Sequence, residues 1–143
     1  MLLGEFKHNL DDKGRIAIPA KFRTTLSDGA IMTKGLDGCL FMFGLSEWKI
    51  LAEKLVKLPL AQSNSRAFVR LMLAGAVDAR VDVQGRVLVP DYLRKYSKLK
   101  KQVIIAGLYN RIELWDADRW EKYKEKTEGS SEEIAEQLSE LGI

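Results

Sequence analysis

An aspartate and an arginine four residues apart occur twice in this chain, with a glycine directly before each arginine. Asp11 and Arg15 form the first pair, and Asp82 and Arg86 form the second. Aspartate at the first position and glycine at the fourth are typical of a type I turn. The aspartate side chain can accept a hydrogen bond from the backbone two residues later, which stiffens the turn. We therefore expect each arginine to begin a returning strand and to reach the carboxylate across the turn.

These pairs have a structural and a functional interpretation. In the structural one, each ion pair only holds a turn, which any duplicated hairpin would contain. In the functional one, the arginine reaches a guanine edge or a phosphate while the aspartate holds it in place. An arginine fork matches the two acceptors of guanine, and such a contact contributes roughly 1–3 kcal/mol of discrimination between bases.

The two turns differ in charge. The first contains Lys13 and Gly14 before Arg15, and Lys7 and His8 are near in sequence. The second contains Gln84 and Gly85 in the corresponding places, with Val83 before them, and two further aspartates are close by. If only one copy contacts a polyanion, it should be the first. The predicted DNA contacts are Lys13, Gly14, Arg15, Lys7 and His8, and the predicted structural turn residues are Asp11, Asp82, Gly85 and Arg86.

The pairs belong to a longer internal repeat. Residues 11–23 return as 82–94 with five identical positions, and the match resumes later, for example with Trp48 and Trp120. Two copies are too few for a stacked array, so they are expected to close around one shared core. Single hairpins are marginal in water. We predict an α+β fold in which two tandem repeats interleave their hairpins in a small β-barrel with pseudo-twofold symmetry, with helices on the outside.

The elements of this fold follow from apolar spacing and from proline and glycine positions. Strands are expected at residues 5–10, 15–18, 31–33, 40–43, 77–81, 103–106 and 111–115. Helices are expected after Pro19, from Ser46 (as a cap) to 58, over 63–74, after Pro90, from Asp116 or Asp118, and after a capping box at 130–133.

Length and composition exclude several classes of protein. The 143 residues suffice for one domain, no apolar run is long enough to span a bilayer, and the first residues predict no signal peptide. Cys39 is the only cysteine and lies in an apolar run, which predicts a buried, inert thiol in a reducing cytoplasm. One histidine without a ligand-spaced partner, and no nucleophile or phosphate-loop motif, argue against an enzyme, a metal site or a cofactor.

Charge is unevenly distributed along the chain. Residues 128–143 contain five glutamates and no lysine or arginine, so the remaining body holds 23 basic and 15 acidic residues. A basic body favours a polyanion partner. The acidic segment is expected to be a solvated amphipathic helix or, alternatively, to dock on a neighbour's basic face. An oligomeric scaffold that reads no bases is the alternative function, and RNA ranks below duplex DNA because the aromatic residues lie in apolar runs.

Over nearly its whole length the chain resembles the MraZ proteins of bacteria. The resemblance rests on both Asp-x-x-Gly-Arg motifs, on Gly35-Leu36-Asp37, Arg66-Ala67-Phe68 and Gly75-Ala76, and on Asn110-Arg111-Ile112-Glu113-Leu114-Trp115. It implies a doubled AbrB-type swapped-hairpin barrel and a DNA-contacting loop at Lys13-Gly14-Arg15 with Asp11 as its anchor. The acidic tail departs from the core family pattern.

The resemblance also implies partners and organisation. It implies a cytoplasmic, nucleoid-associated transcriptional regulator that assembles into a ring. The regulator would bind repeated boxes in the promoter of the division and cell-wall gene cluster, and no membrane or small-molecule substrate is expected. One domain at 1–127 would hold two repeats (about 1–58 and 76–127) and a helical crossover at 46–74, followed by the tail at 128–143.

Overall fold

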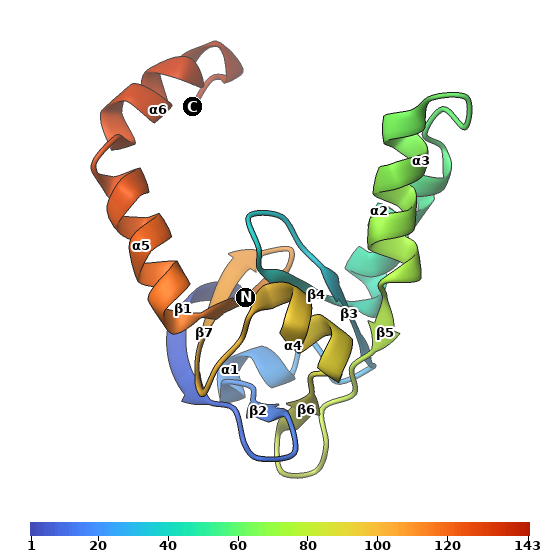
Figure 1. Cartoon of the computed structure of the whole chain (residues 1–143), viewed down its shortest axis with the longest axis vertical. Coiled ribbons are helices and arrows are strands. Elements are labelled where there is room, and N and C mark those ends of the chain that lie inside the picture. The colour runs from blue at the N-terminus through green and yellow to red at the C-terminus, as the bar shows by residue number, and fades with distance from the viewer.

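The computed structural model describes all residues 1–143, and its strands form two antiparallel sheets (Figure 1). The strands are β1 (Leu2–Asn9), β2 (Arg15–Ala17), β3 (Ala30–Lys34), β4 (Leu40–Gly44), β5 (Val77–Asp78), β6 (Arg86–Leu88), β7 (Gln102–Tyr109) and β8 (Ile112–Asp116). Six of them form a sheet in the order β1-β7-β8-β4-β3-β5, and β2 pairs with β6 in the second sheet. All predicted strands are present, although β5 is shorter than expected.

The helices agree with the predicted positions, but two predicted caps are wrong, because the capping box at 130–133 makes no side-chain hydrogen bond and Ser46 is not a cap. They are α1 (Ala20–Arg23), α2 (Leu45–Val56), α3 (Ser63–Val69), the π-helical turn η1 (Arg70–Ala74), α4 (Asp91–Ser97), α5 (Ala117–Glu128), α6 (Ser131–Gln137) and the 3-10 turn η2 (Ser139–Leu141). Ser46 does not cap α2, because β4 runs directly into the helix and Gly44 takes the cap position. Asp116 does cap α5, where its carboxylate accepts a hydrogen bond from the Arg119 backbone at 3.3 Å. None of the helices combines the length and the apolar character that crossing a membrane requires.

Strands of the two repeats pair with each other. β1 of the first repeat pairs with β7 of the second along its whole length, and β2 pairs with β6. β3 and β4 of the first repeat pair with β5 and β8 of the second. Neither repeat therefore completes its own sheet.

The predicted closed barrel is not present, because the large sheet is open. Its two edges are β1 and β5, which do not pair with each other. The ladder between β5 and β3 covers only two residues of β5, and one further bond, from the Ala79 N–H to the Ala30 carbonyl, extends it. Beyond that point the chain runs through the Asp82 turn into β6, which pairs with β2 in the second sheet.

The large sheet is covered on both faces, which explains its continuous apolar runs. Alternate residues of β4 belong to different clusters: Leu40 and Met42 pack with β2, β6, α1 and α4, whereas Phe41 and Phe43 pack with the side of α2, η1 and α5. The first cluster has 17 buried residues and joins Ile16 and Ile18 of one repeat to Val87 and Val89 of the other. A single core is thus shared by both repeats.

The helices beyond this core form two arms. The α2–α3 hairpin and the α5–α6 segment project from the sheet on separate sides, and the β1–β2 and β5–β6 turns lie together at the opposite end of the molecule (Figure 1). The arms expose apolar side chains, including Leu60 (82% exposed) and Leu141 (71% exposed). The apolar side chains of the acidic segment, Ile134, Leu138 and Leu141, are therefore not covered within one chain.

Candidate nucleic-acid interface

The first turn is built around the Asp11 carboxylate. One carboxylate oxygen accepts hydrogen bonds from the backbone N–H groups of Lys13 (2.9 Å) and Arg15 (2.8 Å). The other oxygen accepts from Nε of Arg15 at 2.8 Å. The Gly14 N–H donates to the Asp11 carbonyl at 3.0 Å and closes the turn. The predicted contact between arginine and aspartate across the turn is confirmed.

The second turn repeats these bonds at the matching positions. Asp82 accepts hydrogen bonds from the backbone of Gln84 and Arg86, both at 2.9 Å, and from Nε of Arg86 at 3.1 Å. In both turns the backbone bond to the arginine is the largest cause that lowers the pKa of the aspartate. Both carboxylates are therefore charged at neutral pH and suited to hold a guanidinium.

Each turn is bonded to the residue that directly follows the short strand of the other repeat. The Gly14 carbonyl accepts a hydrogen bond from the Val89 N–H, and the Gly85 carbonyl accepts one from the Ile18 N–H, both at 2.8 Å. The glycines have φ values of +79° and +80°, which L side chains rarely adopt. The two turns are thus held side by side at one end of the molecule (Figure 1).

A second pair of arginines contributes to this arrangement, and their role was missed in the sequence. The guanidinium of Arg94 lies where a Cβ on Gly14 would be, and that of Arg23 lies where a Cβ on Gly85 would be. Arg23 donates to the Ile18 carbonyl at 2.9 Å, and Arg94 donates to the Val89 carbonyl at 3.1 Å. The sequence did contain a sign of this role, because both repeats have an arginine four residues after a proline.

The two motif arginines are equally exposed but differently engaged. Their side chains are 30% exposed for Arg15 and 29% for Arg86. The terminal nitrogen Nη1 of Arg86 is 4.0 Å from the Asp11 carboxylate of the neighbouring turn. Arg15 uses only Nε on Asp11, and its two terminal nitrogens make no hydrogen bond or ion pair. A fork held in this way can donate to two acceptors of a ligand.

The other predicted contacts are less concentrated than the sequence indicated. Lys13 is exposed at the tip of the first turn, whereas Gly14 is buried. Lys7 and His8 are consecutive residues of β1, so their side chains point to opposite faces of the sheet. His8 lies on the same face as Phe6 and Leu10, which pack against the core, and it is half-buried. Only Lys13 and Arg15 therefore stand together at the turn.

Two further features of the structure are the placement of metal-ligating side chain types and the state of the single cysteine. No group of three or more His, Cys, Asp or Glu side chains is positioned to hold a metal ion. Cys39 is buried, as predicted, and burial raises the pKa of its thiol well above the usual value. Its sulfur donates to the Leu36 carbonyl at 3.2 Å.

The lowered pKa values predict a pH-dependent contribution to stability. A carboxylate with a depressed pKa in the folded state stabilises the fold above its unfolded pKa, which for aspartate is about 4. This contribution is lost as the pH falls through the folded value. We expect the double variant Asp11→Asn/Asp82→Asn to melt at a lower temperature than the wild type at about pH 7. The difference should be smaller at about pH 3, because the pH there has fallen below the unfolded pKa and toward the lowered folded one.

Thermal melting followed by circular dichroism at both pH values measures this difference. Asp12→Asn removes an exposed charge from the same turn and is the matched control, which should change the melting temperature little. An equally large gap between the double variant and the wild type at both pH values would contradict the predicted linkage.

Comparison with known proteins gives a family. A family model described as "MraZ protein, putative antitoxin-like" matches the chain twice, over residues 1–71 and 72–141. The "Transcriptional regulator MraZ" of Caldanaerobacter subterraneus subsp. tengcongensis is 50% identical over 143 residues, which cover the whole of both chains. Proteins of the same name from Thermoanaerobacter pseudethanolicus and Halothermothrix orenii are also 50% identical over their whole length. Since the model matches both repeats and these relatives align over the full length, the chain belongs to the MraZ family.

Proposed function

We propose that the protein is a transcriptional regulator that binds duplex promoter DNA through its first turn. Arg15 reads a guanine edge in the major groove, and Lys13 contacts the adjacent backbone. The observation that carries this proposal is the state of Arg15, whose Nε is held by Asp11 while both terminal nitrogens are unengaged. The O6 and N7 acceptors of guanine fit such a fork.

The second turn has a supporting role in this proposal. Arg86 holds Asp82 in its own turn through Nε, and its Nη1 lies 4.0 Å from the Asp11 carboxylate of the first turn, which attracts it weakly toward that turn. Gln84 stands in the second turn where Lys13 stands in the first. The second turn therefore presents one cation fewer to a base pair than the first.

Assembly of several chains would strengthen binding. One turn with two cations is a small footprint, whereas linked subunits on repeated boxes make later contacts intramolecular and raise avidity by roughly 10²–10⁴. The exposed apolar side chains of both arms support a homo-oligomer, and we propose a ring. The proposed body is 1–127, and the proposed tail is 128–143. The proposed targets are repeated boxes upstream of the division and cell-wall gene cluster, in a cytoplasmic, nucleoid-associated setting.

Arg15→Ala should remove promoter preference without unfolding the protein. The preference for the DNA upstream of its own gene over a shuffled duplex should fall roughly 5- to 150-fold, which corresponds to ~1–3 kcal/mol. Arg86→Ala should keep most of that preference. Binding isotherms on both duplexes measure the ratio, and Arg80→Ala is the control for loss of one exposed positive charge.

Two outcomes would contradict these roles. Folded Arg15→Ala protein with wild-type preference would reject base reading by the first turn and would favour a scaffold. An equal loss in Arg86→Ala would reject the asymmetry and assign base reading to both turns.

Spacing between boxes should control the affinity of the assembled protein. Insertion of about 5 base pairs, half a helical turn, rotates one box away from its subunit and should weaken binding strongly. Insertion of about 10 base pairs, a full helical turn, returns both boxes to the same face of the duplex and should weaken binding much less. Mobility-shift titrations of the three fragments test this expectation, and identical affinities would reject the multivalent arrangement.

A further inference from the structure

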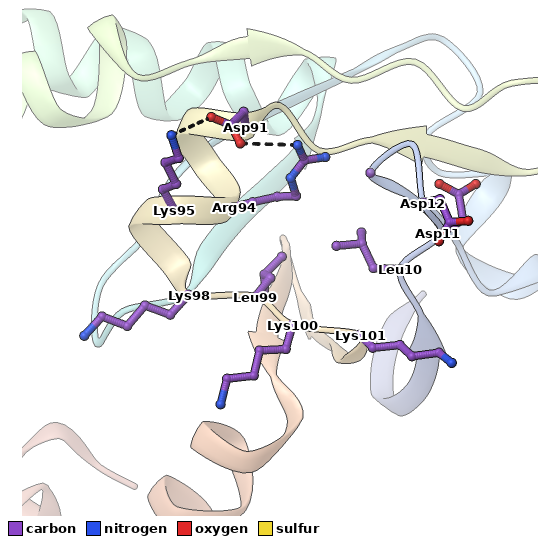
Figure 2. A pocket seen from close by; sticks show the side chains of 11 residues that line it. Leu10, Asp11, Asp12, Asp91, Arg94, Lys95, Lys98, Leu99, Lys100 and Lys101 are labelled. Atoms are coloured by element: carbon purple, nitrogen blue, oxygen red, sulfur yellow. Dashed lines mark hydrogen bonds and ion pairs between the residues drawn. The ribbon is translucent and has the colours of Figure 1, made fainter.

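A groove of about 610 Å³ lies beside the first turn, at the connection between α4 and β7 (Figure 2). Its lining is mostly charged, and only two of its residues, Leu10 and Leu99, are hydrophobic. The complete lining is Leu10, Asp11, Asp12, Gly14, Asp91, Arg94, Lys95, Lys98, Leu99, Lys100 and Lys101. Such a surface suits a charged partner better than an apolar one.

The positive charge of this groove is only partly neutralised. Asp91 pairs with Arg94 at 3.4 Å and with Lys95 at 3.0 Å. The other three lysines, at positions 98, 100 and 101, are exposed and belong to none of the ion pairs of the structure. We call them the lysine rim. Their charges are available to a partner.

The lysine rim is fixed next to the proposed base-reading turn. The Leu10 N–H donates to the Lys101 carbonyl at 2.7 Å, and Leu10 directly precedes Asp11. The lysine rim and the first turn come from different repeats and are 83 or more residues apart in sequence, so only the interleaved fold brings them together. A partner seated on Lys13 and Arg15 would extend over the lysine rim.

The corresponding place beside the second turn is not basic. There the hollow is smaller, about 160 Å³, and is lined by Leu26, Ser27, Asp28, Gly29, Arg80 and Val81. The internal repeat aligns Ser27 with Lys98, and Asp28 and Gly29 occupy the part that is lysine-rich on the other side. The structure therefore has one basic flank, and it accompanies the turn that carries Lys13.

The orientation of the lysine rim indicates the shape of its partner. The side chains of Lys98, Lys100 and Lys101 point in different directions and do not converge on one point (Figure 2). A single small anion needs convergent donors, whereas successive phosphates of a nucleic-acid backbone are spread along a strand. The divergent arrangement fits an extended polyanion.

We propose that the lysine rim, Lys98, Lys100 and Lys101, binds the phosphates of duplex DNA that flank the base pair read by the first turn. This inference rests on the proposed binding of duplex DNA by that turn. The phosphate contacts carry no sequence information, but they add affinity and fix the orientation of the protein on the duplex. They also make binding strongly dependent on salt, because each neutralised phosphate releases counterions.

The test compares the full-length wild type with the triple variant Lys98→Gln/Lys100→Gln/Lys101→Gln. The matched control is Lys49→Gln/Lys54→Gln/Lys57→Gln, which removes the same charge from exposed positions in and next to α2. Dissociation constants are measured across a salt series on the DNA upstream of its own gene and on a shuffled duplex of equal length. Single variants Lys100→Gln and Lys101→Gln repeat the test if the triple variant melts early.

The lysine-rim variant should make the negative slope of log K against log salt shallower by about 2–3 on both duplexes, because each phosphate contact contributes about 0.9 to its steepness. Each single variant should lower it by about 0.9. The ratio of affinities for the two duplexes should not change, and the control should keep the wild-type slope. This pattern differs from that of Arg15→Ala, which changes the ratio.

Equal slopes for the lysine-rim variant and the control would overturn the inference, even if promoter preference persists. The lysine-rim variant could also change its oligomeric state and keep the wild-type salt slope. That result would overturn the inference, because the lysine rim would then bind the acidic tail of a second copy and not DNA. Absence of promoter preference in the wild type would reject base reading by the first turn. The salt slope on the shuffled duplex would still test the phosphate contacts.

Discussion

The carbonyl of each turn glycine accepts a hydrogen bond from the strand that follows the other turn, and this exchange joins the two repeats. The Gly14 carbonyl accepts from the Val89 N–H, and the Gly85 carbonyl accepts from the Ile18 N–H, both at 2.8 Å. Isolated hairpins of this size would be marginal in water. Because the exchange brings Ile16 and Ile18 against Val87 and Val89, it creates the shared apolar core that neither repeat could form alone.

The same exchange of hydrogen bonds positions the charged side chains of the two turns. It brings the two aspartate–arginine pairs to one end of the molecule, far from the helical arms (Figure 1). The two turns have nearly identical hydrogen bonds, so their backbone geometry does not distinguish them. Their surroundings differ in charge, because the lysines that accompany the first turn are absent from the second. The two turns thus form a symmetric frame, and the lysines on one side distinguish the turn with the proposed ligand.

Local features could be predicted from the sequence because they depend on nearby residues. The Asp11–Arg15 bond, the strands and most helix limits follow from turn chemistry and apolar spacing. The open sheet could not be predicted, because it depends on where the β5 ladder ends. The position of Arg94 over Gly14 and that of Lys101 beside Leu10 were also missed. Both join segments about 80 or more residues apart, which local patterns do not relate.

Methylation interference on the promoter fragment tests base reading by Arg15 most directly, because methyl groups on guanine N7 block the major-groove acceptor that an arginine fork requires. Base reading by the first turn predicts that methylation of particular guanines in the boxes prevents wild-type binding. Folded Arg15→Ala protein should be insensitive to the same methyl groups. If no guanine methylation interferes with the wild type, while ethylation of phosphates does, the turn contacts only the backbone and base reading by Arg15 is wrong.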